Sequence, residues 1–133
     1  MGLSARLGRH CLLFHERHRP KGELREPLAL DSFESFEWSQ YHPTSFHLAL
    51  GQRSHFLYGF TDAELRRSGR MTQAQRCKRE ALEGRFGRPD PQATEKEVEA
   101  VLRLVVPGPS SFVLHTDEHA AYPRAIGKLA GYA

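Results

Sequence analysis

Two aspartates stand at the polar edges of short apolar runs that are typical of buried strands. Asp31 directly follows the apolar residues 28–30, and Asp117 comes three residues after the run 112–114. A carboxylate at the end of a buried strand is held rigidly beside solvent, and Mg²⁺ prefers oxygen ligands. Two such strands side by side would aim both carboxylates at one ion, Mg²⁺ or Mn²⁺. Asp31 and Asp117 are therefore the candidate catalytic residues and metal ligands.

Each of these residues also has a plainer interpretation. Asp117 could cap a helix that begins near Glu118, and aspartates at strand ends often only turn the chain. His115 and His119 bracket Asp117 with an i, i+4 spacing that suggests zinc. The sequence contains no HExxH motif and neither cysteine is near, so zinc is the weaker interpretation.

Four longer segments carry a family resemblance. They are LDSFESFE at residues 30–37, SQYHP at 39–43, YGFTDAELRR at 58–67 and LHTDEHAAYPRA at 114–125. Together they resemble the catalytic domain of DDE-class transposases of bacterial insertion sequences, over about residues 27–127. The resemblance implies an RNase H-like fold in which three acidic residues bind two Mg²⁺ ions, with Asp31 and Asp117 in the first two positions. It also implies DNA cleavage and strand transfer, with transposon ends and a target duplex as DNA partners, and it allows a homo-oligomer.

The third acidic residue of that family lies on a helix well beyond the second aspartate, whereas this sequence ends sixteen residues after Asp117. We therefore expect a truncated transposase. Residues 1–26 would be an N-terminal basic helix and linker, and residues 27–133 a partial RNase H-like catalytic domain without its C-terminal part.

Activity of such a fragment is an open question at the level of sequence. Two ions about 3.5–4 Å apart need several carboxylates to offset their charge. Two aspartates are too few, so we expect the chain to be inactive alone. The alternative function is a catalytically inactive transposase relic that acts only as a nonspecific DNA-binding or interaction protein.

Charge is segregated along the chain. The net charge of +3 hides an acidic block at residues 23–64, of net charge −5, and a basic block at residues 65–88, of net charge +6. Lys and Arg neutralise phosphate without reading the base sequence. A solvated helix face is the alternative interpretation of such a block. The candidate DNA-binding residues are Arg66, Arg67, Arg70, Arg76, Lys78, Arg79, Arg85 and Arg88.

Length and composition set the broad class. A chain of 133 residues can form one domain with a real core. Cys11 and Cys77 are too few for a disulfide framework or a CxxC zinc site, and there is no secretory signal or apolar run of membrane length. We expect a cytoplasmic protein with no membrane partner.

Hydrophobic spacing and capping signals predict the elements that would hold these residues. Ser4 is expected to cap the first helix, which Pro20 ends. Thr72 and Thr94 would begin two further helices as capping boxes with Gln75 and Glu97. The expected order is a helix of about fourteen residues, strands at 27–37, 45–50 and 55–60 with a hairpin loop at 51–54, helices at 72–86 and 94–105, a strand at 111–115 and a helix at 118–129.

These elements predict an α/β fold with a mixed sheet. Three antiparallel strands and one parallel strand would carry helices packed on the sheet, as part of an RNase H-like fold. A strand that returns through helices can lie parallel to the first strand, which would make Asp31 and Asp117 neighbours. Glu34 is a poorer ligand, because an offset of three residues sends its side chain to the opposite face from Asp31.

The remaining side chains divide between core, edge and loops. The helix at 94–105 carries an apolar stripe that would pack on the sheet, formed by Val98, Val101, Leu102 and Val105, whereas the helix at 72–86 is expected to be peripheral. Trp38 and Tyr41 would close the sheet edge, with stacking on a base as the alternative. Core packing is expected for Phe33, Phe56, Leu57, Phe112 and Leu114, and a place in the hairpins for His42, His47 and His55.

Overall fold

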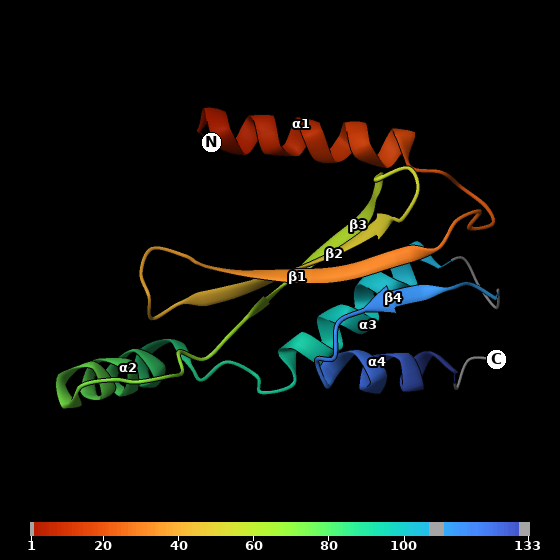
Figure 1. The fold of residues 1–133 in the computed structure, drawn as a ribbon. Coiled ribbons are helices and arrows are strands. Elements are labelled where there is room, and N and C mark those ends of the chain that lie inside the picture. Colours follow the sequence, from red (N-terminus) through yellow and green to blue (C-terminus); the bar gives the residue numbers. More distant parts are fainter. Residues whose placement is uncertain (1, 107–110, 131–133) are drawn as a thin grey trace.

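The computed structural model describes residues 2–106 and 111–130. Helices α3 and α4 lie against one face of a twisted sheet, α1 lies beside the edge strand β3, and α2 lies past one end of the strands (Figure 1). The elements are α1 (Leu3–His18), β1 (Leu28–Phe36), β2 (Pro43–Gly51), β3 (Leu57–Glu64), α2 (Gln73–Phe86), α3 (Ala93–Val105), β4 (Leu114–Thr116) and α4 (Ala121–Ala130).

The sheet has the strand order β3-β2-β1-β4. Strand β2 pairs antiparallel with both β1 and β3, and β4 pairs parallel with β1. The predicted mixed sheet with three antiparallel strands and one parallel strand is thus confirmed. The short β4 begins at Leu114 rather than at residue 111, and α4 begins at Ala121 rather than at residue 118.

One face of the sheet forms the core. Leu28 and Leu30 of β1 and Ala49 of β2 are buried there, because alternate residues of a strand point to the same side. The apolar stripe of α3 packs onto them, and all four of its predicted members are buried: Val98, Val101, Leu102 and Val105. At Gly59 of β3 even a Cβ atom would come within 3.1 Å of the Leu104 side chain, so a small residue lets α3 approach.

The opposite face of the sheet remains largely open. Phe33 of β1 stacks on Phe46 of β2 with ring centroids 5.0 Å apart, yet Phe33 is 52% exposed. The prediction that Phe33 lies in the core is wrong, because its odd position on β1 directs it away from α3. Leu114 and Phe112 do pack against the core, as predicted, and Phe56 and Leu57 are half-buried.

A single carboxylate fastens the β2–β3 hairpin to the start of β1. Glu26 accepts hydrogen bonds from the backbone N–H groups of Arg53 and Ser54, from the Ser54 hydroxyl and from the Tyr58 hydroxyl, at 2.5–2.9 Å. These bonds, led by the one from the Ser54 hydroxyl, lower the pKa of Glu26 to about 2. Gly51 is required beside it, since a Cβ atom there would overlap the carboxylate.

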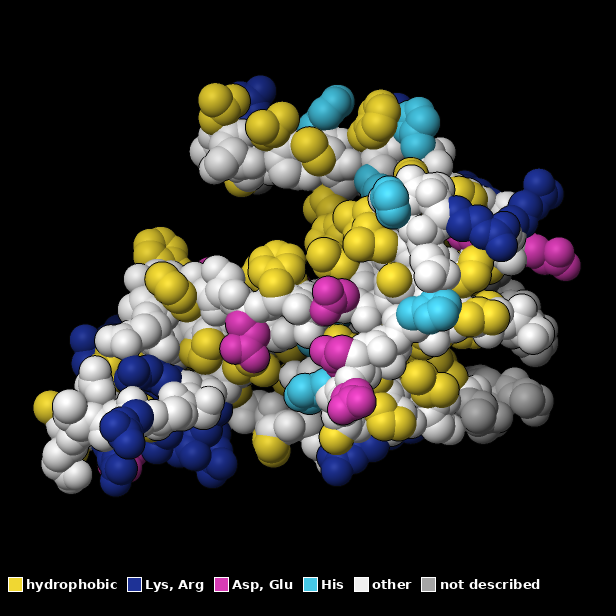
Figure 2. Space-filling model, viewed as in Figure 1, with side chains coloured by type: hydrophobic (Ala, Val, Ile, Leu, Met, Phe, Trp, Pro, Cys, Tyr) yellow, Lys and Arg dark blue, Asp and Glu magenta, His cyan; other side chains and the backbone are white. Residues whose placement is uncertain are grey.

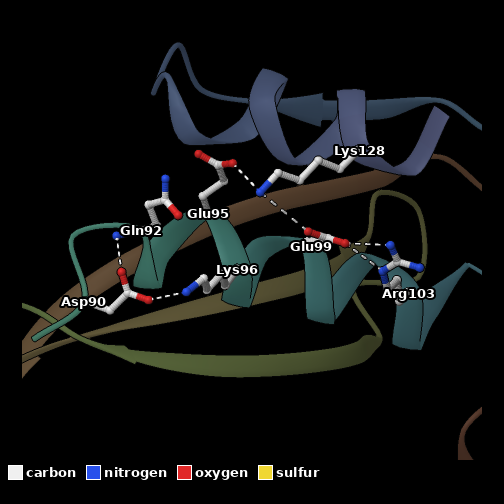
Figure 3. A network of polar contacts seen from close by, with 7 residues as sticks. All are labelled: Asp90, Gln92, Glu95, Lys96, Glu99, Arg103 and Lys128. Atoms are coloured by element: carbon white, nitrogen blue, oxygen red, sulfur yellow. Dashed lines mark hydrogen bonds and ion pairs between the residues drawn. The ribbon is translucent and has the colours of Figure 1, made fainter. Parts of the chain in front are cut away.

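Charged side chains hold α4 against α3 (Figure 3). Lys128 of α4 lies 2.6 Å from the Glu95 carboxylate and 4.0 Å from that of Glu99, and Glu99 also pairs with Arg103 at 2.6 Å. The predicted capping box of Thr94 is wrong, because α3 begins after Gln92 without a side-chain cap. The turn before α3 is held by Asp90, which accepts from the Gln92 backbone N–H and pairs with Lys96.

The two remaining helices are peripheral. No residue of α1 or α2 is buried, and α2 was predicted to be peripheral. The predicted capping box of α2 is confirmed, with Thr72 and Gln75 exchanging hydrogen bonds. Ser4 is no cap, since α1 begins after Gly2. Among the helices that the structure describes, none has the length and apolar character needed to cross a membrane.

The packing of α3 predicts a sharp difference between two leucines of that helix. Leu102 is 0% exposed and Leu104 is 48% exposed. We expect Leu102→Ala to lower the free energy of unfolding by about 2–5 kcal/mol, because a buried cavity replaces packed atoms. Leu104→Ala is the matched control, with an expected loss of about 1 kcal/mol or less. Urea unfolding measures both values, and equal losses would contradict the assignment of the core face.

Candidate functional site

The paired strands β1 and β4 bring the two predicted aspartates to one place in the sheet. Leu28 pairs with Leu114 and Leu30 with Thr116 in parallel register. Asp31 and Asp117 directly follow the last pair of this register, and Asp117 is the first residue past the end of β4. Residues paired in this way point to the same face. Both aspartates are exposed.

Each carboxylate also has a local structural bond. One oxygen of Asp31 accepts from the backbone N–H of Ser32 at 2.7 Å. One oxygen of Asp117 accepts from the backbone N–H of His119 at 2.9 Å, which turns the chain from β4 toward α4. The turn-forming interpretation of Asp117 therefore holds geometrically, and it leaves the second carboxylate oxygen facing solvent.

Tyr122 joins the two segments that carry the aspartates. Its hydroxyl donates to the Ser32 hydroxyl at 3.2 Å, so a buried residue of α4 is tied to the residue after Asp31. Burial raises the pKa of Tyr122, the Ser32 hydrogen bond opposes that rise, and the negative charges of Asp117 and Asp31 add to it.

Carboxylate oxygens such as those of Asp31 and Asp117 suit a hard divalent cation. Asp31 and Asp117 would hold such an ion. Within the ranges 2–106 and 111–130, no three His, Cys, Asp or Glu side chains are grouped in a way that could bind a metal.

A buried histidine lies on the core side of the same strands. His47 of β2 pairs in register with Ser32 and is 1% exposed, and neither ring nitrogen has a hydrogen-bond partner. His47 is a residue of the β2–β3 hairpin, as predicted, and its side chain points into the core. Burial lowers its pKa, the charge of His119 lowers it further, and Asp62 opposes both. The alternation of β2 places His47 with Ser45 and Ala49, which is the sequence signal for its burial.

The histidines around Asp117 occupy distinct places. His115 lies on β4 opposite Ala29 and is exposed. One ring nitrogen of His119 accepts from the Ala121 backbone N–H at 3.2 Å, and its ring meets Tyr122 edge-on at 6.0 Å. His119 therefore helps to begin α4.

The predicted DNA-binding residues fall into two groups. Lys and Arg side chains gather over α2, at the lower left of Figure 2. Some of them make contacts within the protein: Arg66 pairs with Glu83 at 2.6 Å, and Arg79 donates to the Arg67 carbonyl at 3.1 Å. Lys78 is exposed although its ammonium lies over the Tyr41 ring. The others are exposed around α2: Arg70, Arg76, Arg85 and Arg88.

Comparison with known proteins gives no relative to place beside this site. No protein-family model matches the chain, and neither a curated protein nor a solved structure matches it.

The environment of His47 predicts a pH dependence of stability. The folded protein disfavours the imidazolium, so above the unfolded pKa near 6.5 both states are neutral and stability is at its full value. As the pH falls from about 7.5 to 5.5, the unfolded chain takes up the proton first and stability falls. We expect His47→Leu to reduce this fall and to leave stability at pH 8 unchanged or higher, because it removes two buried nitrogens without partners.

The control is His10→Leu, since His10 is an exposed residue of α1. It should keep the wild-type pH profile in urea unfolding followed by circular dichroism. A wild-type profile in the His47→Leu variant would show that this imidazole does not govern stability in that range.

Proposed function

We propose that this chain forms part of a DDE-type transposase catalytic domain with an RNase H-like fold. Its reaction would be phosphodiester cleavage and strand transfer on DNA, dependent on Mg²⁺ or Mn²⁺. Asp31 and Asp117 would be the cation ligands. The observation that supports the proposal is the parallel pairing of β1 with β4, because Asp31 and Asp117 are the residues that directly follow the last pair, Leu30 with Thr116.

The groups around this edge have separable tasks. Asp31 and Asp117 would bind the cation, and the tie from Tyr122 to Ser32 would keep their two segments together. The cation would supply a lowered pKa for an attacking water or hydroxyl and charge stabilisation for the leaving oxygen. Such a site needs a third carboxylate. Among the described residues, no three His, Cys, Asp or Glu side chains form a group that could bind a metal. The proposal therefore assigns the third ligand to another chain.

The cation ligands can be tested by binding. We expect Mn²⁺, followed by paramagnetic broadening of amide signals, to act first on residues near Asp31 and Asp117. Asp31→Asn and Asp117→Asn should each weaken Mg²⁺ or Mn²⁺ binding by about tenfold or more, because a charged ligand is removed.

Glu34→Gln is the matched control for this measurement. Glu34 lies on the same exposed part of β1 but on the opposite face of the sheet, so the binding constant should not change. Equal effects of all three substitutions would indicate diffuse attraction to acidic surface and would refute a site at the β1–β4 edge.

A second candidate function is DNA binding without catalysis. The exposed cationic side chains around α2 favour it, since they can neutralise phosphates whatever the base sequence. This function needs neither aspartate, and it would hold if the β1–β4 edge bound no cation.

DNA binding is expected to be salt-dependent and indifferent to sequence. Replacing the exposed residues Arg76, Lys78 and Arg85 with Gln should weaken binding to all duplexes alike. It should reduce the slope of log K against log salt by up to roughly 3, at about 0.9 for each phosphate that is no longer neutralised. Fluorescence anisotropy with two unrelated duplexes at several salt concentrations measures both quantities.

Glu80→Gln tests the sign of the effect on the same helix. Glu80 is exposed on α2, so removal of its negative charge should strengthen binding slightly. If the triple variant lost affinity for only one of the two duplexes, the interface would be reading bases. That result would contradict a purely electrostatic interface.

A further inference from the structure

A pocket of about 500 Å³ lies at the end of β1 remote from the β4 pairing. It opens between the turn that follows β1 and the C-terminal half of α2, and its volume lies within the range of small-molecule sites. Six of its lining residues carry the argument: Glu37, Trp38, Tyr41, Arg67, Arg79 and Phe86.

Two arginines of the lining have buried N–H groups without acceptors. The Nη1 atom of Arg67 and the Nε atom of Arg79 are shielded from solvent and make no hydrogen bond. Glu83 lies 3.8 Å from the Arg79 Nε atom, which is too far for a hydrogen bond, and Glu83 already pairs with Arg66 at 2.6 Å. A buried donor without a partner is costly, so a small rotation of either guanidinium that brought its N–H to an acceptor in the pocket would be favoured.

Trp38 is unusual in both exposure and backbone geometry. The chain's one tryptophan is 93% exposed at the pocket, so it does not close the sheet edge as predicted. Its φ of 64° lies in the left-handed region, where a bulky side chain is strained. Hydrogen bonds of the turn hold it there, including Glu37 N–H to the His42 carbonyl at 2.8 Å. Folding buries almost none of this indole, so apolar packing does not account for its place.

Two further aromatic rings and a lysine lie in or beside the pocket. Tyr41 has the Arg67 guanidinium 5.1 Å and the Lys78 ammonium 5.0 Å from its ring centroid, and Phe86 is exposed beside them. The lining itself holds Arg66, Arg67 and Arg79 against three glutamates, so its formal charge is balanced. Attraction of an anion therefore depends on the two buried N–H donors and on the nearby Lys78.

We propose that this pocket binds a nucleotide unit, with the phosphate on the Arg67 and Arg79 N–H groups and the base stacked on Trp38. Charge-assisted hydrogen bonds to arginine suit phosphate oxygens, and stacking on an aromatic ring tolerates any base. The unit is either a free mononucleotide or an unpaired nucleotide of a strand, since a base within a duplex cannot present its face to an indole.

The pocket is separate from the proposed cation site. Six residue steps separate Asp31 from Glu37, which corresponds to about 20 Å at roughly 3.3 Å per residue. Binding here needs no metal. Measurements in EDTA thus keep a failure of the nucleotide pocket distinguishable from a failure of the cation site.

Trp38 provides the probe, because no other tryptophan contributes fluorescence. The purified chain is titrated in EDTA with inorganic phosphate, with dTMP, with a single-stranded octathymidylate and with a duplex of the same length. We expect dTMP or the single strand to quench Trp38 strongly and the duplex to quench it far less. If dTMP saturates the quenching and binds as tightly as the strand, the ligand is a free nucleotide. If the single strand binds at least tenfold more tightly than dTMP, the ligand is an unpaired nucleotide within a strand.

Two variants separate binding from folding. Arg67→Gln should weaken binding by about tenfold or more, whereas Arg70→Gln removes the same charge outside the pocket and should change it less than threefold. Trp38→Asn should weaken binding of a dye-labelled octathymidylate by about tenfold, yet its melting temperature should equal or exceed that of the wild type. Asn tolerates the left-handed backbone, so this variant should remain folded. A melting temperature at or above that of the wild type would show that the loss of binding does not come from unfolding.

The proposal is overturned if none of the four probes quenches Trp38 at millimolar concentration. It is also overturned if inorganic phosphate displaces the labelled strand as well as dTMP does and dTMP does not quench Trp38. In that case the base would not contribute to binding. If Arg67→Gln and Arg70→Gln weakened binding equally, binding would depend on general surface charge and not on the pocket.

Discussion

The burial of the α3 stripe against β2 and β3 is the constraint on which the other features depend. Val98, Val101 and Leu102 share one buried cluster with Leu28 and Leu30 of β1, and this cluster decides which face of the sheet is the core. With that face fixed, strand alternation directs the odd residues of β1 to the open side. The same packing provides the surface on which α4 docks, and α4 in turn holds the end of β4 beside β1 through Tyr122.

Much of this arrangement could be predicted because its signals are local. The stripe of α3 repeats at helical spacing and is complete within one segment, and the capping box of Thr72 spans four residues. The parallel place of β4 could be predicted from the topology that a helical connection allows. The adjacency of Asp31 and Asp117 follows from that register, while their metal-binding role stays a prediction.

The misses have a different cause, which is that residue type alone does not fix the environment of these side chains. Phe33 was assigned to the core by its apolarity alone, although its parity on β1 sends it to the open face. His47 is buried on the face of β2 that α3 covers, and no local pattern marks an imidazole without partners. Nothing around Trp38 in the sequence indicates a left-handed backbone, because the turn that imposes it is closed by His42.

The two ends of β1 differ in what holds them, and this difference bears on function. The end that pairs with β4 rests on the apolar core, whereas α2 has no buried residue and is docked by polar contacts such as Arg66 with Glu83 and Arg79 with the Arg67 carbonyl. Elements with few buried apolar contacts open more readily. Added salt screens ion pairs and phosphate contacts alike, so it would loosen α2 from the turn as it weakens DNA binding. Apolar packing is not screened in this way. A ligand that bridged Trp38 to Arg67 and Arg79 would add a contact between α2 and the sheet that the free chain lacks, and would therefore stabilise the docked position of α2 in proportion to its affinity.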